Sequence, residues 1–277
     1  MTTQRFNLKG KTALITGAAG LLGLEHTSAL LECGANVVLT DISSSGLDKA
    51  IYKLRSEFPK SNIYSFQMDV SSLKSINSIF RQLNELSIKV NILINNAAID
   101  PKVKSGEDVI DSSRLENISR EEWDRQIEVG LTGALHCSQI FGSSMAYKGN
   151  GGVIINIASD LSVISPDQRL YKKQGLDDNN QPVKPVTYSV IKFGLIGLTR
   201  YIATYWADKG VRCNALSPGG VLNNQGQEFI NKVSQLIPIE RLANPSEYRA
   251  AIQFLCSDAS SYMNGHNLVI DGGRSIW

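Results

Sequence analysis

Short runs of apolar residues alternate along the chain with longer segments of helical periodicity. The short runs have the length of strands and are continuously apolar, as in a parallel sheet that helices cover on both faces. They predict strands at Thr12–Thr16, Asn36–Thr40, Ile63–Met68, Ile92–Ile94, Val153–Ala158, Arg212–Leu216 and Asn267–Ile270.

The segments between these strands predict helices. They run from the turn after Thr16 to about Cys33, and over Leu47–Phe58, Ile76–Leu86, Glu121 to about Lys148, and Tyr188–Lys209. We therefore predict one α/β domain over residues 1–277. Its fold is a Rossmann-like, doubly wound parallel sheet of about seven strands, with helices on both faces.

Two long polar stretches interrupt this alternation, near residues 100–119 and 161–186. Both are rich in Pro, Gly, Asp and Lys, and both follow the carboxyl end of a predicted strand. Open α/β sheets bind ligands at that edge, and long loops inside a compact domain are usually functional or disordered. We expect both insertions to reach a ligand site. The alternative is a lid or subunit contact without chemistry.

Composition and charge exclude several classes of protein. The chain has 28 basic and 26 acidic residues, a net charge of +2 and 42% hydrophobic residues, which is ordinary globular composition. This balance gives no basic face for nucleic acid. The uncharged stretch 129–147 contains His, Gln, Ser, Thr and Gly, so it predicts a packed helix and no membrane association. The first residues show no apolar segment typical of a secretory signal.

Neither the cysteines nor the histidines have the spacing of metal ligands. The cysteines form no CxxC pair, which argues against zinc and disulfides and favours a reducing, cytoplasmic location. We expect no metal. These residues are Cys33, Cys137, Cys213, Cys256, His26, His136 and His266.

A glycine-rich turn follows the first predicted strand and opens a helix. Residues 16–23 read TGAAGLLG. Glycines there allow a tight turn and the close approach of a pyrophosphate to backbone N–H groups at the helix N-terminus. Asp41 ends the second predicted strand, where a carboxylate can bind the adenosine ribose hydroxyls and repel a 2′-phosphate. The cofactor predicted is NAD, with NADP less favoured; the alternative is that Asp41 caps the following helix.

A tyrosine and a lysine four residues apart open a later helix, as Tyr188 and Lys192. That spacing puts both side chains on one helix face. A free phenol has a pKa near 10, and a neighbouring ammonium favours its ionised form. Ser159, just past a predicted strand, can hydrogen-bond the same substrate oxygen. These groups predict acid–base chemistry at a hydroxyl or carbonyl group.

Taken together, these motifs resemble the short-chain dehydrogenase/reductase family over nearly the whole chain. Besides the glycine turn, the chain has Asp69-Val70, the turn Asn95-Asn96-Ala97-Ala98, the segment Asn214–Gly219 and the C-terminal Asp271-Gly272-Gly273. The resemblance implies that Ser159, Tyr188 and Lys192 are catalytic. It also implies cofactor contacts from Gly17, Ala19, Gly20, Leu21, Leu22, Gly23, Asp41, Ile42, Asp69, Val70, Asn96, Ala97, Tyr188, Lys192, Pro218, Gly219 and Val221.

Three positions depart from the classical pattern of that family. The turn reads TGxxGxxG, which is typical of the extended branch with its epimerases and dehydratases, whereas the NNAA turn and the DGG ending favour the classical branch. Gly130 stands where the family usually has an Asn that supports a proton relay. We expect water to replace that amide, so that Gly130→Asn changes the rate only modestly. Asn223 stands where a Thr is frequent.

The leading hypothesis is an NAD-dependent oxidoreductase that interconverts a secondary alcohol and a ketone on a small polar, sugar-like substrate. Alternatives are a sugar-nucleotide epimerase or dehydratase with tightly held NAD, and a non-catalytic NAD-binding sensor. The insertions carry Arg114 and Arg169, which predict binding of an anionic sugar. They also resemble a subgroup that modifies bacterial surface carbohydrates, including flagellin. The family resemblance implies a homodimer or homotetramer through the helices that begin at Glu121 and Tyr188.

Overall fold

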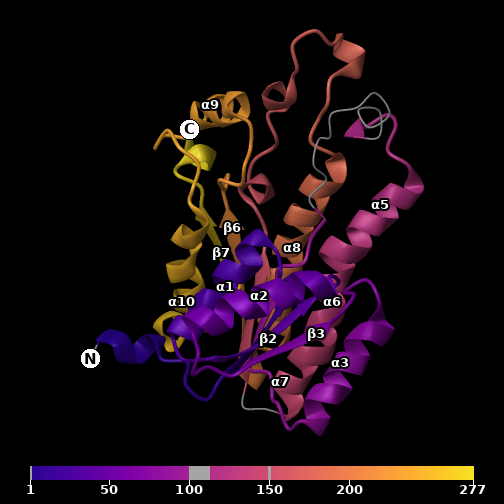
Figure 1. Ribbon diagram of the computed structural model, residues 1–277. Coiled ribbons are helices and arrows are strands. Elements are labelled where there is room, and N and C mark those ends of the chain that lie inside the picture. The colour runs from indigo at the N-terminus through magenta and orange to yellow at the C-terminus, as the bar shows by residue number, and fades with distance from the viewer. Residues whose placement is uncertain (1, 100–112, 149–150) are drawn as a thin grey trace.

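One parallel sheet of seven strands organises the computed structural model, which describes residues 2–99, 113–148 and 151–277 (Figure 1). The strand order is β3-β2-β1-β4-β5-β6-β7. The chain adds its first strands toward one edge of the sheet and the strands from β4 onward toward the other edge, so the order changes between β1 and β4. Ligands of doubly wound sheets bind beside that point, at the carboxyl ends of the strands. The strands are β1 Thr12–Thr16, β2 Asn36–Asp41, β3 Ile63–Gln67, β4 Ile92–Asn95, β5 Gly152–Ile157, β6 Val211–Pro218 and β7 Asn267–Ile270. The predicted fold class and all seven predicted strands are confirmed.

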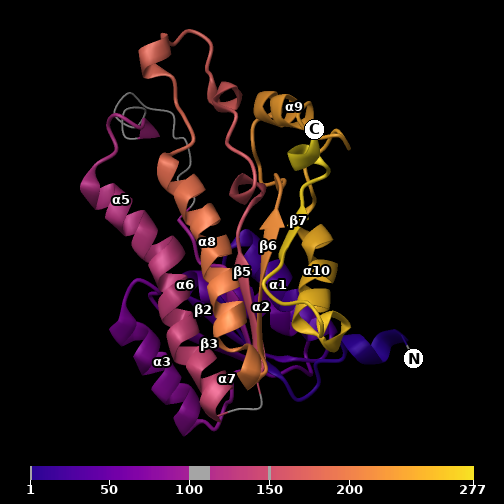
Figure 2. The same cartoon turned by 180° about the vertical axis from the view of Figure 1, so that it is seen from behind.

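Helices cover both faces of the sheet (Figures 1 and 2). Helices α1 (Leu21–Glu32), α2 (Ser44–Glu57) and α10 (Arg249–Cys256) pack on one face. Helices α3 (Leu73–Glu85), α6 (Gly133–Cys137) and α8 (Val186–Tyr205) pack on the other. None of the helices in the described ranges is long and apolar enough to cross a membrane.

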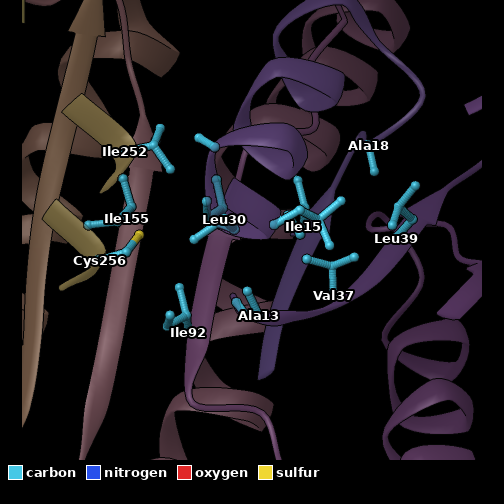
Figure 3. Close-up of a cluster of buried hydrophobic side chains, with 14 of the residues drawn as sticks. Ala13, Ile15, Ala18, Leu30, Val37, Leu39, Ile92, Ile155, Ile252 and Cys256 are labelled. Atoms are coloured by element: carbon cyan, nitrogen blue, oxygen red, sulfur yellow. The ribbon is translucent and has the colours of Figure 1, made fainter. Parts of the chain in front are cut away.

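The buried core lies on both sides of the sheet because side chains alternate along each strand. Ala13 and Ile15 of β1 pack with Leu30 of α1 and belong to the same cluster as Ile252 of α10 (Figure 3). Leu14, between them, belongs to the cluster under α3 and α6. All of these side chains are fully buried. Truncating such a leucine or isoleucine to alanine typically lowers the free energy of unfolding by about 2–5 kcal/mol. The packed core therefore holds the strands that position the site.

Three helices begin at a serine that caps the first turn. The hydroxyls of Ser43, Ser72 and Ser119 each accept a hydrogen bond from the backbone N–H three residues later, at 3.0, 3.3 and 3.1 Å. Such caps satisfy N–H groups that have no partner within the helix. Helices α9 (Gln227–Ser234) and α10 are each eight residues long, and the sequence analysis does not predict them.

The segment predicted as one helix from Glu121 to Lys148 is interrupted by two π-helical turns. It consists of α5 (Arg120–Ile127), a π turn at Glu128–Thr132, α6, a second π turn at Ser138–Gly142, and α7 (Ser143–Lys148). Each π turn contains a glycine against a close neighbour. A Cβ on Gly130 would lie 2.8 Å from Cγ2 of Ile191, and one on Gly142 would lie 2.6 Å from the Trp206 ring. Because glycine has no side chain, each π turn can pack directly against its neighbour.

The second insertion is built from short turns that Gln181 and Gln168 hold together. It contains 3₁₀ turns at Gln168–Tyr171 and Asp178–Asn180. The Gln181 amide accepts from Lys173 N at 2.8 Å and donates to Lys173 O at 3.1 Å. Of the first insertion, residues 100–112 lie outside the described ranges.

Candidate active site

A cavity of about 500 Å³ lies at the carboxyl ends of the strands. Its walls come from the glycine turn, the end of β5, the first turns of α8, the end of β6, and α9. Most of the predicted site residues line it. They are Gly17, Gly20, Leu21, Leu22, Gly23, Asp41, Asn96, Ser159, Tyr188, Lys192, Pro218, Gly219 and Val221.

Five residues predicted to contact the cofactor do not line this cavity. Ala19 and Ala97 lie beside it and donate their backbone N–H groups to Asp41 and Thr16. Ile42 is 65% exposed on the loop after β2. Asp69 accepts hydrogen bonds from the backbone and hydroxyl of Ser71, at 2.9 and 2.7 Å. Val70 is buried in the core. Their cofactor contacts stay predictions.

The glycine turn is shaped so that only glycines fit at its two ends. Gly17 has φ +62°, and a Cβ there would lie 2.8 Å from Cα of Ala97. A Cβ on Gly23 would lie 2.3 Å from the carbonyl oxygen of Gly17. Helix α1 begins within the glycine-rich segment, at Leu21. Its N-cap is Gly20, and no side chain makes a capping hydrogen bond. The bare turn and the helix N-terminus therefore fit a pyrophosphate group.

Asp41 joins the glycine turn to the loop after β2. Its Oδ2 accepts from Ala19 N at 3.1 Å, and its Oδ1 accepts from Ser43 N at 2.9 Å. The helix cap is Ser43. The carboxylate faces the cavity at the position where a ribose diol would lie on this fold.

Thr16 and Asn96 hold the glycine turn against the end of β4. The Asn96 amide donates to the carbonyl oxygens of Thr16 and Gly17, both at 3.0 Å. The Thr16 hydroxyl accepts from Asn96 N and Ala97 N, also at 3.0 Å. The sequence analysis missed the bracing role of Thr16, although a threonine directly before the glycine turn was a visible signal.

The predicted catalytic residues come together from β5 and α8. Pro185 precedes the first residue of α8, so Tyr188 and Lys192 lie within its first two turns. Lys192 is buried, its Nζ donates to Ile157 O at 2.8 Å, and it lies 5.5 Å from the centroid of the Tyr188 ring. The Ser159 hydroxyl donates to Asp160 Oδ1 at 2.8 Å.

Asp160 and Arg274 form a buried ion pair beside Ser159 that the sequence analysis missed. Arg274 Nη1 lies 2.7 Å from Asp160 Oδ2, and the two side chains are 9% and 5% exposed. Asp160 Oδ1 also accepts from Leu161 N at 2.8 Å. The pair ties the C-terminal 3₁₀ turn, Arg274–Ile276, to the serine. An acid directly after Ser159 was the only signal for it in the sequence.

Neither arginine predicted to bind substrate lines the cavity. Arg169 is 82% exposed at its side chain and is paired with Asp167 at 2.7 Å. Arg114 donates to the carbonyl oxygen of Asp178 at 3.1 Å and so holds the tip of the second insertion. Their guanidinium groups stabilise the insertions. Among the described cations of the two insertions, Lys184 is the one that lines the cavity, and the sequence analysis missed it.

One wall of the cavity is apolar, although the insertion that helps form it is polar overall. Leu170 packs in a cluster with Val233 of α9, and the rings of Tyr171 and Phe229 lie 5.9 Å apart. The insertion therefore closes onto α9 and gives one side of the site a water-poor surface. Asn223 and Gln225 supply amide groups to the lining of the same cavity.

Gly130 lies where its π turn packs closely against another helix. Its π turn lies against α8, where a Cβ would come within 2.8 Å of Ile191, a neighbour of Lys192 in the chain. The expectation that Gly130→Asn changes the rate only modestly stays a prediction, although this close contact weighs against it. A larger side chain would push on the helix that carries the catalytic pair.

The cysteines and His26 lie away from the site's chemistry. Burial raises the pKa of the Cys137 and Cys256 thiols to about 12, so both are protonated at neutral pH. His26 is completely buried, and burial lowers its pKa to about 3. Within the described ranges, no group of three or more His, Cys, Asp or Glu side chains could hold a metal ion.

Comparisons with known proteins identify relatives over nearly the whole chain. Residues 17–275 match the family described as enoyl-(acyl carrier protein) reductase. An NAD-dependent glycerol dehydrogenase of Listeria innocua serovar 6a is 31% identical, over 98% of this chain and 96% of the relative. A D-threitol dehydrogenase of Mycolicibacterium smegmatis is 30% identical, over 98% and 95%. A crystal structure of a Leptospira borgpetersenii short chain dehydrogenase with bound NAD+ is 31% identical, with a TM-score of 0.83 over 98% and 94% of the two chains.

Proposed function

Because this chain belongs to the short-chain dehydrogenase/reductase family, we propose that it oxidises a secondary hydroxyl of a small polyol to a ketone, and catalyses the reverse reaction. The observation that carries this is the convergence of Ser159, Tyr188, Lys192 and the glycine turn on one cavity. The dehydrogenase names of the relatives support a sugar alcohol as substrate.

The chain's own residues supply proton transfer and orientation. Tyr188 accepts the proton of the substrate hydroxyl during oxidation and returns it during reduction. Lys192 favours the ionised phenol, because an ammonium close to a phenol stabilises its charged form. Ser159 hydrogen-bonds the same substrate oxygen once its hydroxyl turns from Asp160. The bound nicotinamide accepts or supplies the hydride at the substrate carbon.

We test this proposal by measuring which substrates the protein turns over and how Tyr188→Phe changes the rate. Purified protein is assayed by NADH absorbance against glycerol, D-threitol, longer polyols, and phosphorylated and amino sugars. We expect turnover of a polyol and a rate about 10²–10⁴-fold lower for Tyr188→Phe. NAD binding, measured by calorimetry, stays near the wild-type value in that variant. A near-normal rate of Tyr188→Phe would refute the mechanism.

The same panel separates the alternatives. A sugar-nucleotide epimerase or dehydratase would convert its substrate without net NADH, and a sensor would bind NAD without turnover. Preference for an acidic or phosphorylated sugar would support the narrower resemblance to enzymes of surface-carbohydrate modification. Because Arg114 and Arg169 lie outside the cavity, we place no substrate contact on them.

For the cofactor, we propose NAD over NADP. The carboxylate of Asp41 faces the cavity beside the glycine turn, where it would repel a 2′-phosphate. Asp41→Ala is expected to narrow the ratio of kcat/KM for NAD over NADP. Wild-type preference for NADP under matched conditions would contradict the role given to Asp41.

We also propose a cytoplasmic homodimer or homotetramer. Its contact would be the outer face of α5–α8, where Phe193, Tyr201 and Tyr205 are 49, 64 and 57% exposed. Tyr201 and Tyr205 stack with centroids 5.6 Å apart, which forms a contiguous aromatic surface. Light scattering after size-exclusion chromatography measures the mass. A monomer at assay concentration would overturn the oligomer.

A further inference from the structure

Lys184, at the end of the second insertion, lies over the aromatic face of Tyr188. Its Nζ is 3.8 Å from the centroid of the Tyr188 ring, closer than the 5.5 Å of Lys192. Lys184 also lines the cavity. Two ammonium groups therefore lie against one phenol, one from the insertion and one from the helix.

The backbone of Lys184 is held from two sides. The Gln168 amide accepts from Lys184 N at 2.9 Å and donates to Lys184 O at 3.3 Å. Pro185 follows directly, and a residue before proline is confined to extended conformations. The side chain of Lys184 thus starts from a fixed position, which reduces the entropy lost when its ammonium settles over the ring.

Among the described residues, the other charged groups that line the cavity have partners of their own. In the described part of the chain, the cavity is lined by Asp41, Asp160 and Arg274 besides the two lysines. Asp160 is neutralised by its ion pair with Arg274, and Asp41 accepts from backbone N–H groups beside the glycine turn.

Among the described residues, the helix packed against α8 places a paired acid near this contact. Helix α5 touches α8 through Gln126, which accepts from the Thr187 hydroxyl. The neighbouring acid on that helix is Glu122, and its carboxylate pairs with Arg125 at 2.9 Å. Among these groups, Lys184 and Lys192 are the cations placed to act on the phenol.

Resting on the proposed function, we propose that Lys184 is a second cationic partner of Tyr188, held in place by Gln168, and that it stabilises the phenolate that accepts the substrate's proton. The proton moves from the substrate hydroxyl to Oη of Tyr188 as the hydride leaves the same carbon for the nicotinamide. Lys184 acts through the tyrosine, so it is a positioning residue whose effect is electrostatic.

The first test is the pH profile of polyol oxidation in Lys184→Met, Lys184→Arg and the control Lys172→Met. Lys172 belongs to the same insertion, but it pairs with Asp178 at 3.0 Å and does not line the cavity. An opposite charge within about 4–6 Å moves a pKa by 1–3 units. We expect the rise of kcat with pH to shift upward by about one unit in Lys184→Met. That shift is roughly a tenfold loss of rate below the rise.

The other variants, together with Gln168→Ala, show whether the charge and the placement of Lys184 matter. Lys184→Arg should keep the wild-type profile, since it retains the positive charge, and Lys172→Met should also keep it. Gln168→Ala should move the profile in the same direction as Lys184→Met, but by less. An unmoved profile in Lys184→Met would overturn the proposal. A higher KM with the profile unmoved would overturn it too, because Lys184 would then bind substrate directly.

A second measurement reads Tyr188 without turnover. Protein labelled at tyrosine Cζ is titrated by NMR, and Tyr188→Phe identifies the signal. The Tyr188 signal should titrate at higher pH in Lys184→Met than in the wild type. If no polyol is turned over and this shift is present, the proposed function fails and the role of Lys184 stands. If turnover is found and the shift is absent, the role of Lys184 fails alone.

Discussion

Replacing Gly130 by alanine tests whether close packing of two helices holds the catalytic pair. The added Cβ would lie 2.8 Å from Cγ2 and 3.0 Å from Cδ1 of Ile191. Carbon atoms prefer about 3.5–4.0 Å, so the Ile191 side chain or one of the two helices must shift by a sizeable fraction of an ångström. Overpacking of this kind typically costs about 1–3 kcal/mol.

Gly197→Ala is the matched control, since it lies on α8 with nothing within 4 Å of its added Cβ. Both substitutions gain up to about 1 kcal/mol of helix propensity, which cancels in the comparison. Denaturant unfolding should therefore show Gly130→Ala less stable than Gly197→Ala by about 1–3 kcal/mol.

The rate should fall as well, because Ile191 precedes Lys192 on the displaced helix. Misplacement of catalytic groups by about 1 Å can cost on the order of 10²-fold, so we expect kcat of Gly130→Ala to fall by about 10–100-fold. Ile191→Ala makes room for the new methyl group. A double-mutant cycle should show that the two substitutions together cost less than their sum, by at least about 0.5 kcal/mol. Equal stability of the two alanine variants, with an unchanged kcat, would refute the reasoning.

Two further predictions concern buried ionisable groups. Arg274→Met leaves the carboxylate of Asp160 buried without its cation, so unfolding should become easier by about 3–5 kcal/mol, and Arg274→Met/Asp160→Asn should recover part of that loss. A loss below about 1 kcal/mol in denaturant unfolding would contradict the buried pair. For His26, burial lowers the pKa from its ordinary value of 6.5 to about 3 in the folded protein, so between these values the unfolded chain binds more protons. The free energy of unfolding should fall as pH drops through this window, by up to about 1.4 kcal/mol per unit, and His26→Leu should flatten that slope in unfolding curves. An identical slope in the variant would contradict burial as the cause.

The sequence by itself determined the sheet. Continuously apolar runs at Val153–Ala158 and the other strands favour burial on both faces, as in a parallel sheet between helices. The glycine turn was equally readable, because residues 16–23 read TGAAGLLG directly after the first predicted strand and open a helix. The periodicity of apolar residues thus predicted the fold, and the types and spacing of nearby residues predicted the catalytic motif.

Only the tertiary structure decided which charges meet. Arg169 and Lys184 lie in the same polar insertion and look equivalent in sequence, yet one pairs with Asp167 outside the cavity and the other lies over Tyr188. Likewise, Arg274 reaches Asp160 across more than a hundred positions of the chain. Side-chain partners in loops depend on where the folded sheet brings distant segments together. Neither the periodicity of apolar residues nor the composition of the chain predicts those contacts.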